Sequence, residues 1–150
     1  MHVQSFSEIE NDFTERIQRM VWCNVATVDS HNRPRSRVLH PFWEGSVGWI
    51  ATGRNTPKSN HLLHNSAVSL AYVADHIKPV YIDSTAEWID DLDQKQRIWE
   101  LLINTPPPVG YNVAAFFPGG FKHPDFGLLK LTPWRIELGH LGGEARVWSR

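Results

Sequence analysis

The chain has 150 residues, of which 41% are hydrophobic and 21% charged, and its formal net charge is −1. This composition is ordinary for one soluble domain with a core, and without a polybasic run it does not favour bulk binding to nucleic acid or to an anionic membrane. No apolar run approaches the ~18 residues that cross a bilayer, the polar N-terminus lacks the regions of a signal peptide, and a single cysteine allows no internal disulfide, so we expect a cytoplasmic protein.

The first half of the chain predicts one helix followed by three strands. Residues 5–20 carry apolar side chains at helical spacing on one face, and Ser5 with Glu8 fits a capping box at the helix start. Alternating β-branched residues and short turns then predict an antiparallel meander. Its expected strands are residues 21–29, 35–43 and 46–52. Pro41, within the second of them, argues for an edge position or a bulge.

The second half predicts two helices, further strands and a long loop. One helix is expected at 57–65, and another begins near Asp93 and Gln96, which are expected to cap it. Residues 105–127 form a loop rich in Pro, Gly and Phe, and a loop of that length is usually functional or packed against a partner. The expected strands are residues 68–74, 79–89, 128–132 and 134–138, with a short edge strand in the tail.

Many short strands, few helices and frequent turns predict a mainly β fold, namely an antiparallel β-barrel that is closed or nearly closed, with flanking helices. We expect residues 1–150 to form one domain. Within it, the N-terminal helix covers residues 5–20, the barrel covers 21–140 and a tail covers 141–150.

Residues 52–59, TGRNTPKS, predict an anion-binding helix start directly after a buried strand. Thr56 is a good N-cap, and Pro57 suits the first helical position. Free backbone N–H groups at such a start favour negative charge, whereas the helix dipole disfavours a cation such as Lys58 there. A bound phosphate offsets that cost, and the alternative is an ordinary solvated turn with surface charges. The polar groups of this candidate phosphate site are Arg54, Thr56, Lys58 and Ser59.

Four segments carry a resemblance to a known family. They read VATVDSHNRPRSRVLHPFW, GWIATGRNTPKSNHLLHN, VSLAYV and LLKLTPWRIEL. In this order they resemble the flavin-binding split-barrel proteins, the superfamily of pyridoxamine 5′-phosphate oxidase and general stress protein 26. Asn32 stands where the family commonly has Gly, and a turn that needs a positive φ tolerates Asn.

The resemblance implies a split β-barrel homodimer that binds FMN, or alternatively the deazaflavin coenzyme F-420, in a cleft between subunits. Matched position by position, the residues that would hold the flavin phosphate are Arg37, Thr52, Arg54 and Lys58. Those that would lie along the isoalloxazine edge, mainly through backbone groups, are Val38, Leu39 and His40. The nearest candidates for a contribution from the second subunit are Trp134 and Arg135.

The resemblance also implies an FMN-dependent oxidoreductase that acts on a small organic substrate. A deazaflavin-dependent reductase and a non-catalytic flavin or tetrapyrrole carrier stay open as alternatives. True pyridoxamine phosphate oxidase activity is not expected, because that pattern includes an Arg-x-His pair, whereas Arg135 is followed here by Ile136 and Glu137. No catalytic residue is assigned, since in such enzymes the cofactor carries the electrons.

Eight histidines raise the alternative of a metal site. Such sites usually need three or four convergent ligands, and the sequence contains neither HExxH nor CxxC, so no metal site is expected. His61 and His64 are instead expected to lie exposed on their helix. Cys23, in an alternating strand, is expected to be a small buried hydrophobe rather than a nucleophile.

Overall fold

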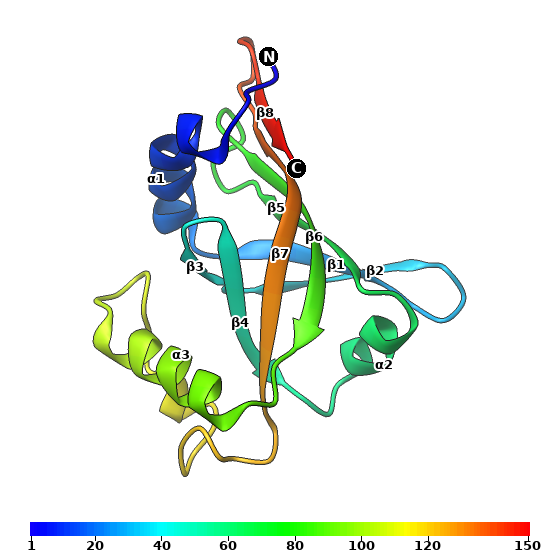
Figure 1. Ribbon diagram of the computed structural model, residues 1–150, viewed down its shortest axis with the longest axis vertical. Coiled ribbons are helices and arrows are strands. Elements are labelled where there is room, and N and C mark those ends of the chain that lie inside the picture. The colour runs from blue at the N-terminus through cyan, green and yellow to red at the C-terminus, as the bar shows by residue number, and fades with distance from the viewer.

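The fold is one strongly twisted antiparallel sheet that curls into a half-barrel, as the computed structural model of residues 1–150 shows (Figure 1). Its strand order is β2-β1-β5-β6-β7-β4-β3, and β8 pairs with β7. The strands are β1 (Cys23–Val28), β2 (Pro34–Leu39), β3 (Phe42–Glu44), β4 (Val47–Gly53), β5 (Ala67–Tyr72), β6 (Val80–Trp88), β7 (Phe126–Leu138) and β8 (Arg146–Ser149). The predicted split-barrel fold, mainly β with flanking helices, is confirmed.

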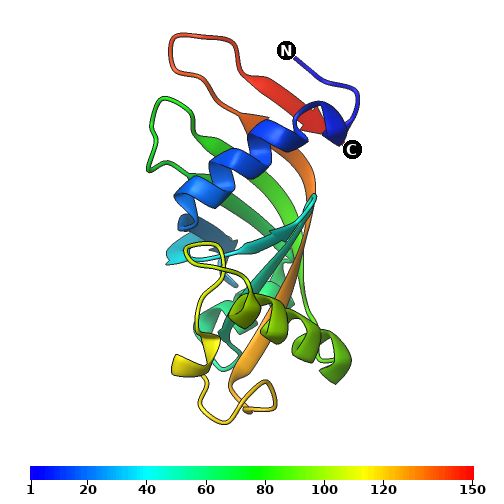
Figure 2. The same cartoon turned by 90° about the vertical axis from the view of Figure 1, so that its left-hand side faces the viewer.

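Three α-helices and two 3₁₀ turns flank the sheet. They are η1 (Phe6–Glu8), α1 (Glu10–Met20), α2 (Pro57–His64), α3 (Leu92–Asn104) and η2 (Val113–Ala115). Figure 2 shows α1 across one half of the sheet, with α3 and the loop that follows it against the other half. None of these helices is long and apolar enough to cross a bilayer.

Two hydrophobic clusters hold these helices to the sheet. Phe13 and Ile17 of α1 pack into the half-barrel with residues such as Leu70, in a cluster of 19 buried residues. Ile98 and Leu102 of α3 belong to a second cluster of nine, under the long loop. Each large apolar side chain that is fully buried stabilises the fold by about 1.5–3 kcal/mol, so the two clusters fix both halves of the sheet.

The predicted meander of three strands is wrong. The segment expected as one strand at 35–43 is interrupted at His40 and Pro41 and forms β2 and β3. β2 pairs with β1 at one edge of the sheet, whereas β3 pairs with β4 at the other edge. Proline has no N–H to continue a ladder, so the chain leaves the first edge at Pro41 and crosses to the second.

The two closing strands expected at 128–132 and 134–138 are one strand, β7, which is continuous through Pro133. Pro133 faces Ser84 where the register between β6 and β7 shifts, and an irregularity of this kind tolerates a proline. The expected edge strand in the tail is confirmed as β8, and Asn32 adopts the expected positive φ, 59°.

The start of α3 also differs from the expectation. Asp91, rather than Asp93, is the N-cap, and its side chain accepts a hydrogen bond of 3.0 Å from the Asp93 N–H. The prediction fails by two residues because several acidic residues here suit a cap equally well. Asp93 instead lies in the first turn, where its negative charge favours the helix.

Candidate functional site

A cavity of about 320 Å³ lies between the end of β2, the second half of β4 and the long loop before β7. Leu39 and His40 line it from the β2 side, and Ala51, Thr52 and Gly53 line it from β4. The loop contributes three aromatic side chains, Tyr111, Phe116 and Phe117. Its size is at the lower end of the range of about 300–1,000 Å³ for ligand pockets, and its apolar walls with few polar groups are typical of sites for flat organic ligands.

Three aromatic rings, tilted against one another, form one wall of this cavity. The His40 ring lies between Trp22 and Tyr111, with centroid distances of 5.1 Å and 4.9 Å. Burial lowers the pKa of His40, so its imidazole is neutral at neutral pH. Burial also raises the pKa of the Tyr111 hydroxyl to about 12. The wall is therefore uncharged and suits an aromatic ring system rather than an ion.

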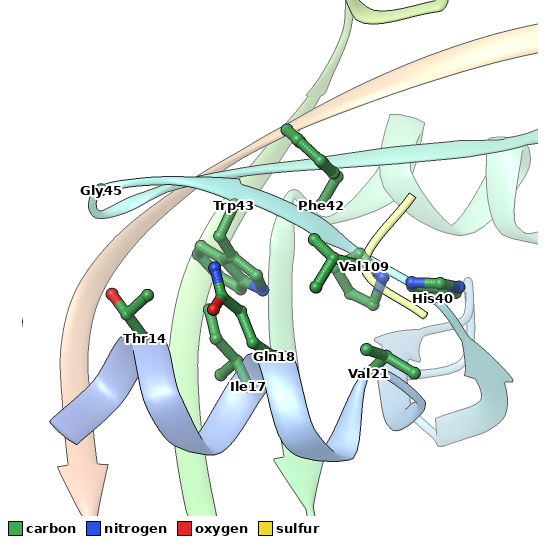
Figure 3. Close-up of a pocket in the computed structure, with 10 residues that line it drawn as sticks. Thr14, Ile17, Gln18, Val21, His40, Phe42, Trp43, Gly45 and Val109 are labelled. Carbon is green, nitrogen blue, oxygen red and sulfur yellow. The ribbon is translucent and has the colours of Figure 1, made fainter. Parts of the chain in front are cut away.

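A second, smaller cavity of about 50 Å³ lies between α1 and β3. Figure 3 shows Ile17 and Gln18 of α1 facing Trp43 of β3, with His40 and Val109 at one end. Its volume is far below the range of about 300–1,000 Å³ for ligand pockets. His40 borders both cavities, but only the larger one can take an organic ligand.

Lys58, in the first turn of α2, is a buried cation with one hydrogen-bond acceptor. Lys58 is only 7% exposed, and its Nζ donates a hydrogen bond of 2.7 Å to Thr56 Oγ1. Burial, and next the positive charge of Arg37, lower the pKa of Lys58 to about 8. A buried charge is unfavourable unless it is paired and fully hydrogen-bonded, so this ammonium lacks an anion.

Arg37 of β2 is the second cation of this cluster. Its Nη1 donates to Val25 O at 3.1 Å, to Thr27 Oγ1 at 2.8 Å and to Arg35 O at 3.1 Å. These bonds hold the guanidinium against β1, while its Nε and Nη2 have no acceptor within the chain. Donors that are fixed and unpaired in this way are arranged to bind an oxyanion in bidentate fashion.

The hydroxyl groups at the start of α2 hold the turn itself. Thr56 is the N-cap residue, and its Oγ1 donates to Gly53 O at 3.1 Å. The Ser59 hydroxyl donates to Arg54 O. The Arg54 guanidinium lies over the Trp88 ring, 4.4 Å from its centroid, and its Nη1 is 3.4 Å from Ser59 Oγ. The predicted phosphate residues of this segment therefore lie together.

The end of the long loop is attached to the same turn. Asp125 Oδ1 accepts from the Asn55 N–H at 3.1 Å, and Asp125 O accepts from the Arg54 N–H at 2.9 Å. The negative charge of Asp125 raises the pKa of Lys58, but by less than burial and Arg37 lower it. The cations Arg37, Arg54 and Lys58 therefore leave an excess of positive charge beside the apolar cavity. Thr52 and Gly53, which line the cavity, connect it to the turn that carries Arg54 and Lys58.

Three of the predicted site residues, within one chain, neither line the cavity nor belong to the group of cations and hydroxyls at the start of α2. Val38 is 59% exposed on the face of β2 opposite to Leu39, since successive strand residues point to opposite faces. Trp134 is half exposed on β7, and Arg135 pairs with Asp83 at 3.5 Å and with Glu137.

The expectation that His61 is exposed is wrong. His61 is buried on α2, and its Nδ1 lies 2.8 Å from Thr27 Oγ1, because this face of the short helix packs on β1. His64 is exposed as expected.

No group of three or more His, Cys, Asp or Glu side chains is placed to hold a metal ion. Cys23 is buried as expected, and burial raises the pKa of its thiol to about 12, so it is not a reactive thiolate.

Sequence reasoning missed several residues of the site. Trp22 was not assigned to it, and the aromatic loop at 105–127 was expected to line a flavin ring only as a whole, without Tyr111, Phe116 or Phe117 being singled out. Thr27 and His61 were also missed. Their contact joins β1 to α2, and nothing in the local pattern indicates it.

Comparisons with known proteins agree with this fold. The family model described as pyridoxamine 5′-phosphate oxidase matches residues 9–138. A protein from Clostridium acetobutylicum related to general stress protein 26 gives a TM-score of 0.78 at 16% identity, over 95% of this chain and 94% of that one. An FMN-binding protein from Nostoc punctiforme related to pyridoxamine 5′-phosphate oxidase gives 0.68 at 20% identity, over 93% and 88%. The haem storage protein HutZ from Vibrio cholerae gives 0.62 at 17% identity, over 83% and 89%. No curated protein matches the sequence.

Proposed function

Because the chain belongs to the pyridoxamine 5′-phosphate oxidase family, we propose that it binds FMN and acts as a flavin-dependent oxidoreductase on a small organic substrate. The phosphate would bind at the start of α2, and the isoalloxazine ring would occupy the aromatic-lined cavity. The observation that carries the proposal is Lys58, a cation that is buried beside Arg37 with a single hydroxyl acceptor.

A phosphate monoester fits the donors of this cluster. It carries a charge of about −1.5 to −2 near neutral pH and has three acceptor oxygens. The Lys58 ammonium and the neighbouring Arg37 guanidinium come from two elements, and the Lys58 N–H in the first turn of α2 has no acceptor in the chain. The Thr56 N–H has no acceptor in the chain. A phosphate here would pair the buried cations and use the N–H groups that the helix start leaves free.

The ring of the flavin fits the cavity next to this cluster. Thr52 and Gly53 connect the two, because they line the cavity and the Gly53 carbonyl accepts a hydrogen bond from the hydroxyl of Thr56, the N-cap of α2. Leu39 and the aromatic side chains of the loop supply apolar walls. When bound there, the flavin supplies hydride or electron transfer. The chain's own residues bind the phosphate, orient the ring and exclude water from it.

A second copy of the chain would complete the site. Trp22 lines the cavity and also a shallow apolar surface with Val38, Ala71 and Val73. Trp22 and Val38 are 57% and 59% exposed, and an apolar patch of this kind on a soluble protein marks an interaction surface. A homodimer that covers this patch would also close the cavity, and the partner copy is where Trp134 and Arg135 could reach the ligand.

Titration of the purified protein with FMN, riboflavin and coenzyme F-420 tests the proposal, with absorbance and flavin fluorescence as readouts. We expect saturable binding of FMN and much weaker binding of riboflavin, which lacks the phosphate. Tighter binding of F-420 than of FMN would favour the deazaflavin alternative, since the same cations serve either phosphate. Equal affinity for FMN and riboflavin would overturn the phosphate site, and reduction of bound FMN without turnover of any substrate would favour a carrier.

A further inference from the structure

A chain of two hydrogen bonds connects Arg37 to α2 through the interior of the protein. Arg37 Nη1 donates to Thr27 Oγ1 at 2.8 Å, and the same oxygen lies 2.8 Å from His61 Nδ1. Thr27 is 2% exposed and His61 is 7% exposed. The chain therefore spans three elements, from β2 through β1 to α2, and it ends on the helix that also carries Lys58.

The donors and acceptors in this chain have one fully satisfied arrangement. A guanidinium only donates, so Thr27 Oγ1 accepts from Arg37. Thr27 Oγ1 has no other partner than Arg37 and His61, so its own hydrogen is satisfied only by donation to His61 Nδ1. Nδ1 is then an acceptor and the proton of the neutral imidazole is on Nε2. Burial, Arg37 and Arg35 all lower the pKa of His61, against a smaller opposite effect of Asp29, and this agrees with the neutral ring.

We propose that Thr27 and His61 are positioning residues, which hold the Arg37 guanidinium in the orientation that binds the phosphate of the cofactor. The inference rests on the proposed function and extends it to two buried residues that do not touch the ligand. Arg37 is on a strand whose other polar side chains are exposed, and a long arginine side chain has many rotamers in such a place. Of the three groups that accept from Nη1, the Thr27 hydroxyl is the only side chain, and the His61 contact fixes that hydroxyl in turn.

The substitution Thr27→Val tests this inference, because it keeps the shape of the side chain and removes the hydroxyl. We expect Thr27→Val to weaken FMN binding on the order of tenfold, the effect of one lost hydrogen bond to a charged group. Riboflavin affinity should not change, because riboflavin has no phosphate for Arg37 to bind. Thr85→Val is the matched control, since Thr85 is exposed on β6, and it should bind FMN like the unaltered protein.

Conservative variants separate positioning from a loss of folding. Thr27→Ser keeps the hydroxyl and should restore FMN affinity to within about twofold. His61→Asn keeps an acceptor near the place of Nδ1 and should bind more tightly than His61→Leu, which removes it. In an Arg37→Met background, Thr27→Val should change FMN affinity by less than about twofold, because the residue through which it acts is gone.

The outcomes distinguish this inference from the function on which it rests. If the unaltered protein binds FMN no better than riboflavin, the proposed phosphate site fails. If it discriminates between the two ligands and Thr27→Val discriminates equally well, only the positioning role fails. Equal losses of FMN affinity on Thr27→Val with and without Arg37 would also overturn it, since Thr27 would then act by another route.

Discussion

The Lys58 ammonium donates to the Thr56 hydroxyl, 2.7 Å away, and this is its only hydrogen bond in a buried position. Two residues of one helix start thus place a cation where the helix dipole opposes it. The arrangement is unfavourable for the protein alone and becomes favourable when an anion is bound. The first two predictions follow from this relationship.

We predict that Lys58→Ala weakens FMN binding by about 1.5–3 kcal/mol, the range for hydrogen bonds to charged groups. Isothermal titration of the apo-protein with FMN measures the effect, and riboflavin affinity should stay unchanged. Lys78→Ala is the control, because Lys78 is exposed between β5 and β6. An unchanged FMN affinity in Lys58→Ala would remove Lys58 from the site.

FMN affinity should also depend on alkaline pH. The pKa of Lys58 is about 8 without ligand, and the negative phosphate raises it, so binding takes up a proton above that value. The association constant for FMN should therefore stay constant from pH 7 to the pKa of Lys58 in the free protein. Above that pH it should fall by up to tenfold per pH unit, because Lys58 must first be protonated. Lys58→Arg, which stays protonated, should flatten the profile up to pH 9. A fall of the same size in that variant would contradict the assignment to Lys58.

The apolar patch beside the cavity predicts a homodimer. A charge at its centre should disfavour association, so we expect Val38→Glu to shift the protein towards monomer and to weaken FMN binding at the same time. Sedimentation velocity at micromolar concentration measures the first effect and FMN titration the second. Leu141→Glu, at another exposed apolar residue, is the control and should change neither. An unaltered protein that sediments as a monomer would refute the dimer.

Gly127 of β7 is expected to tolerate no side chain. A Cβ at this position would lie 2.5 Å from the Trp88 ring and 2.7 Å from Thr52 O. Overpacking of this kind costs typically 1–3 kcal/mol, so Gly127→Ala should lower the thermal midpoint. It should also weaken FMN binding, because Trp88 lies under Arg54 and Thr52 lines the cavity. Calorimetry and FMN titration check the two parts, and a variant of native stability would show that Trp88 moves away freely.

The sequence predicts the phosphate end of the site better than the ring end. The N-cap, the proline, Arg54 and Lys58 lie within eight consecutive residues, so their neighbourhood in space follows from their neighbourhood in the chain; Arg37, on β2, is the exception, and it was assigned through the family resemblance. The ring end combines Trp22, His40 and the loop aromatics, which are far apart in sequence. The crossover of the chain at His40 and Pro41 helps to bring them together, and although Pro41 indicates an interruption of the strand, it does not indicate where the chain goes next.

The difference between local and distant contacts also explains the errors in the predicted fold. Local patterns predicted nearly every strand and helix, since hydrophobic period and turn residues are properties of short segments. The meander failed because it assumed that consecutive strands pair, which is a statement about distant parts of the chain. His61 was expected on a solvated helix face because the eight residues of α2 are too few for a clear amphipathic pattern.

Asp125 connects the last residues of the long loop to the backbone of Arg54 and Asn55. The loop is thus anchored at its exit, while Phe116 and the two glycines at 119 and 120 lie on an open stretch before that anchor. Substitutions in this open stretch would alter the shape of the cavity beside the flavin ring and leave the phosphate-binding residues at the start of α2 unchanged. Among descendants of this sequence, changes in substrate choice are therefore expected to accumulate there, while the residues that bind the phosphate stay the same.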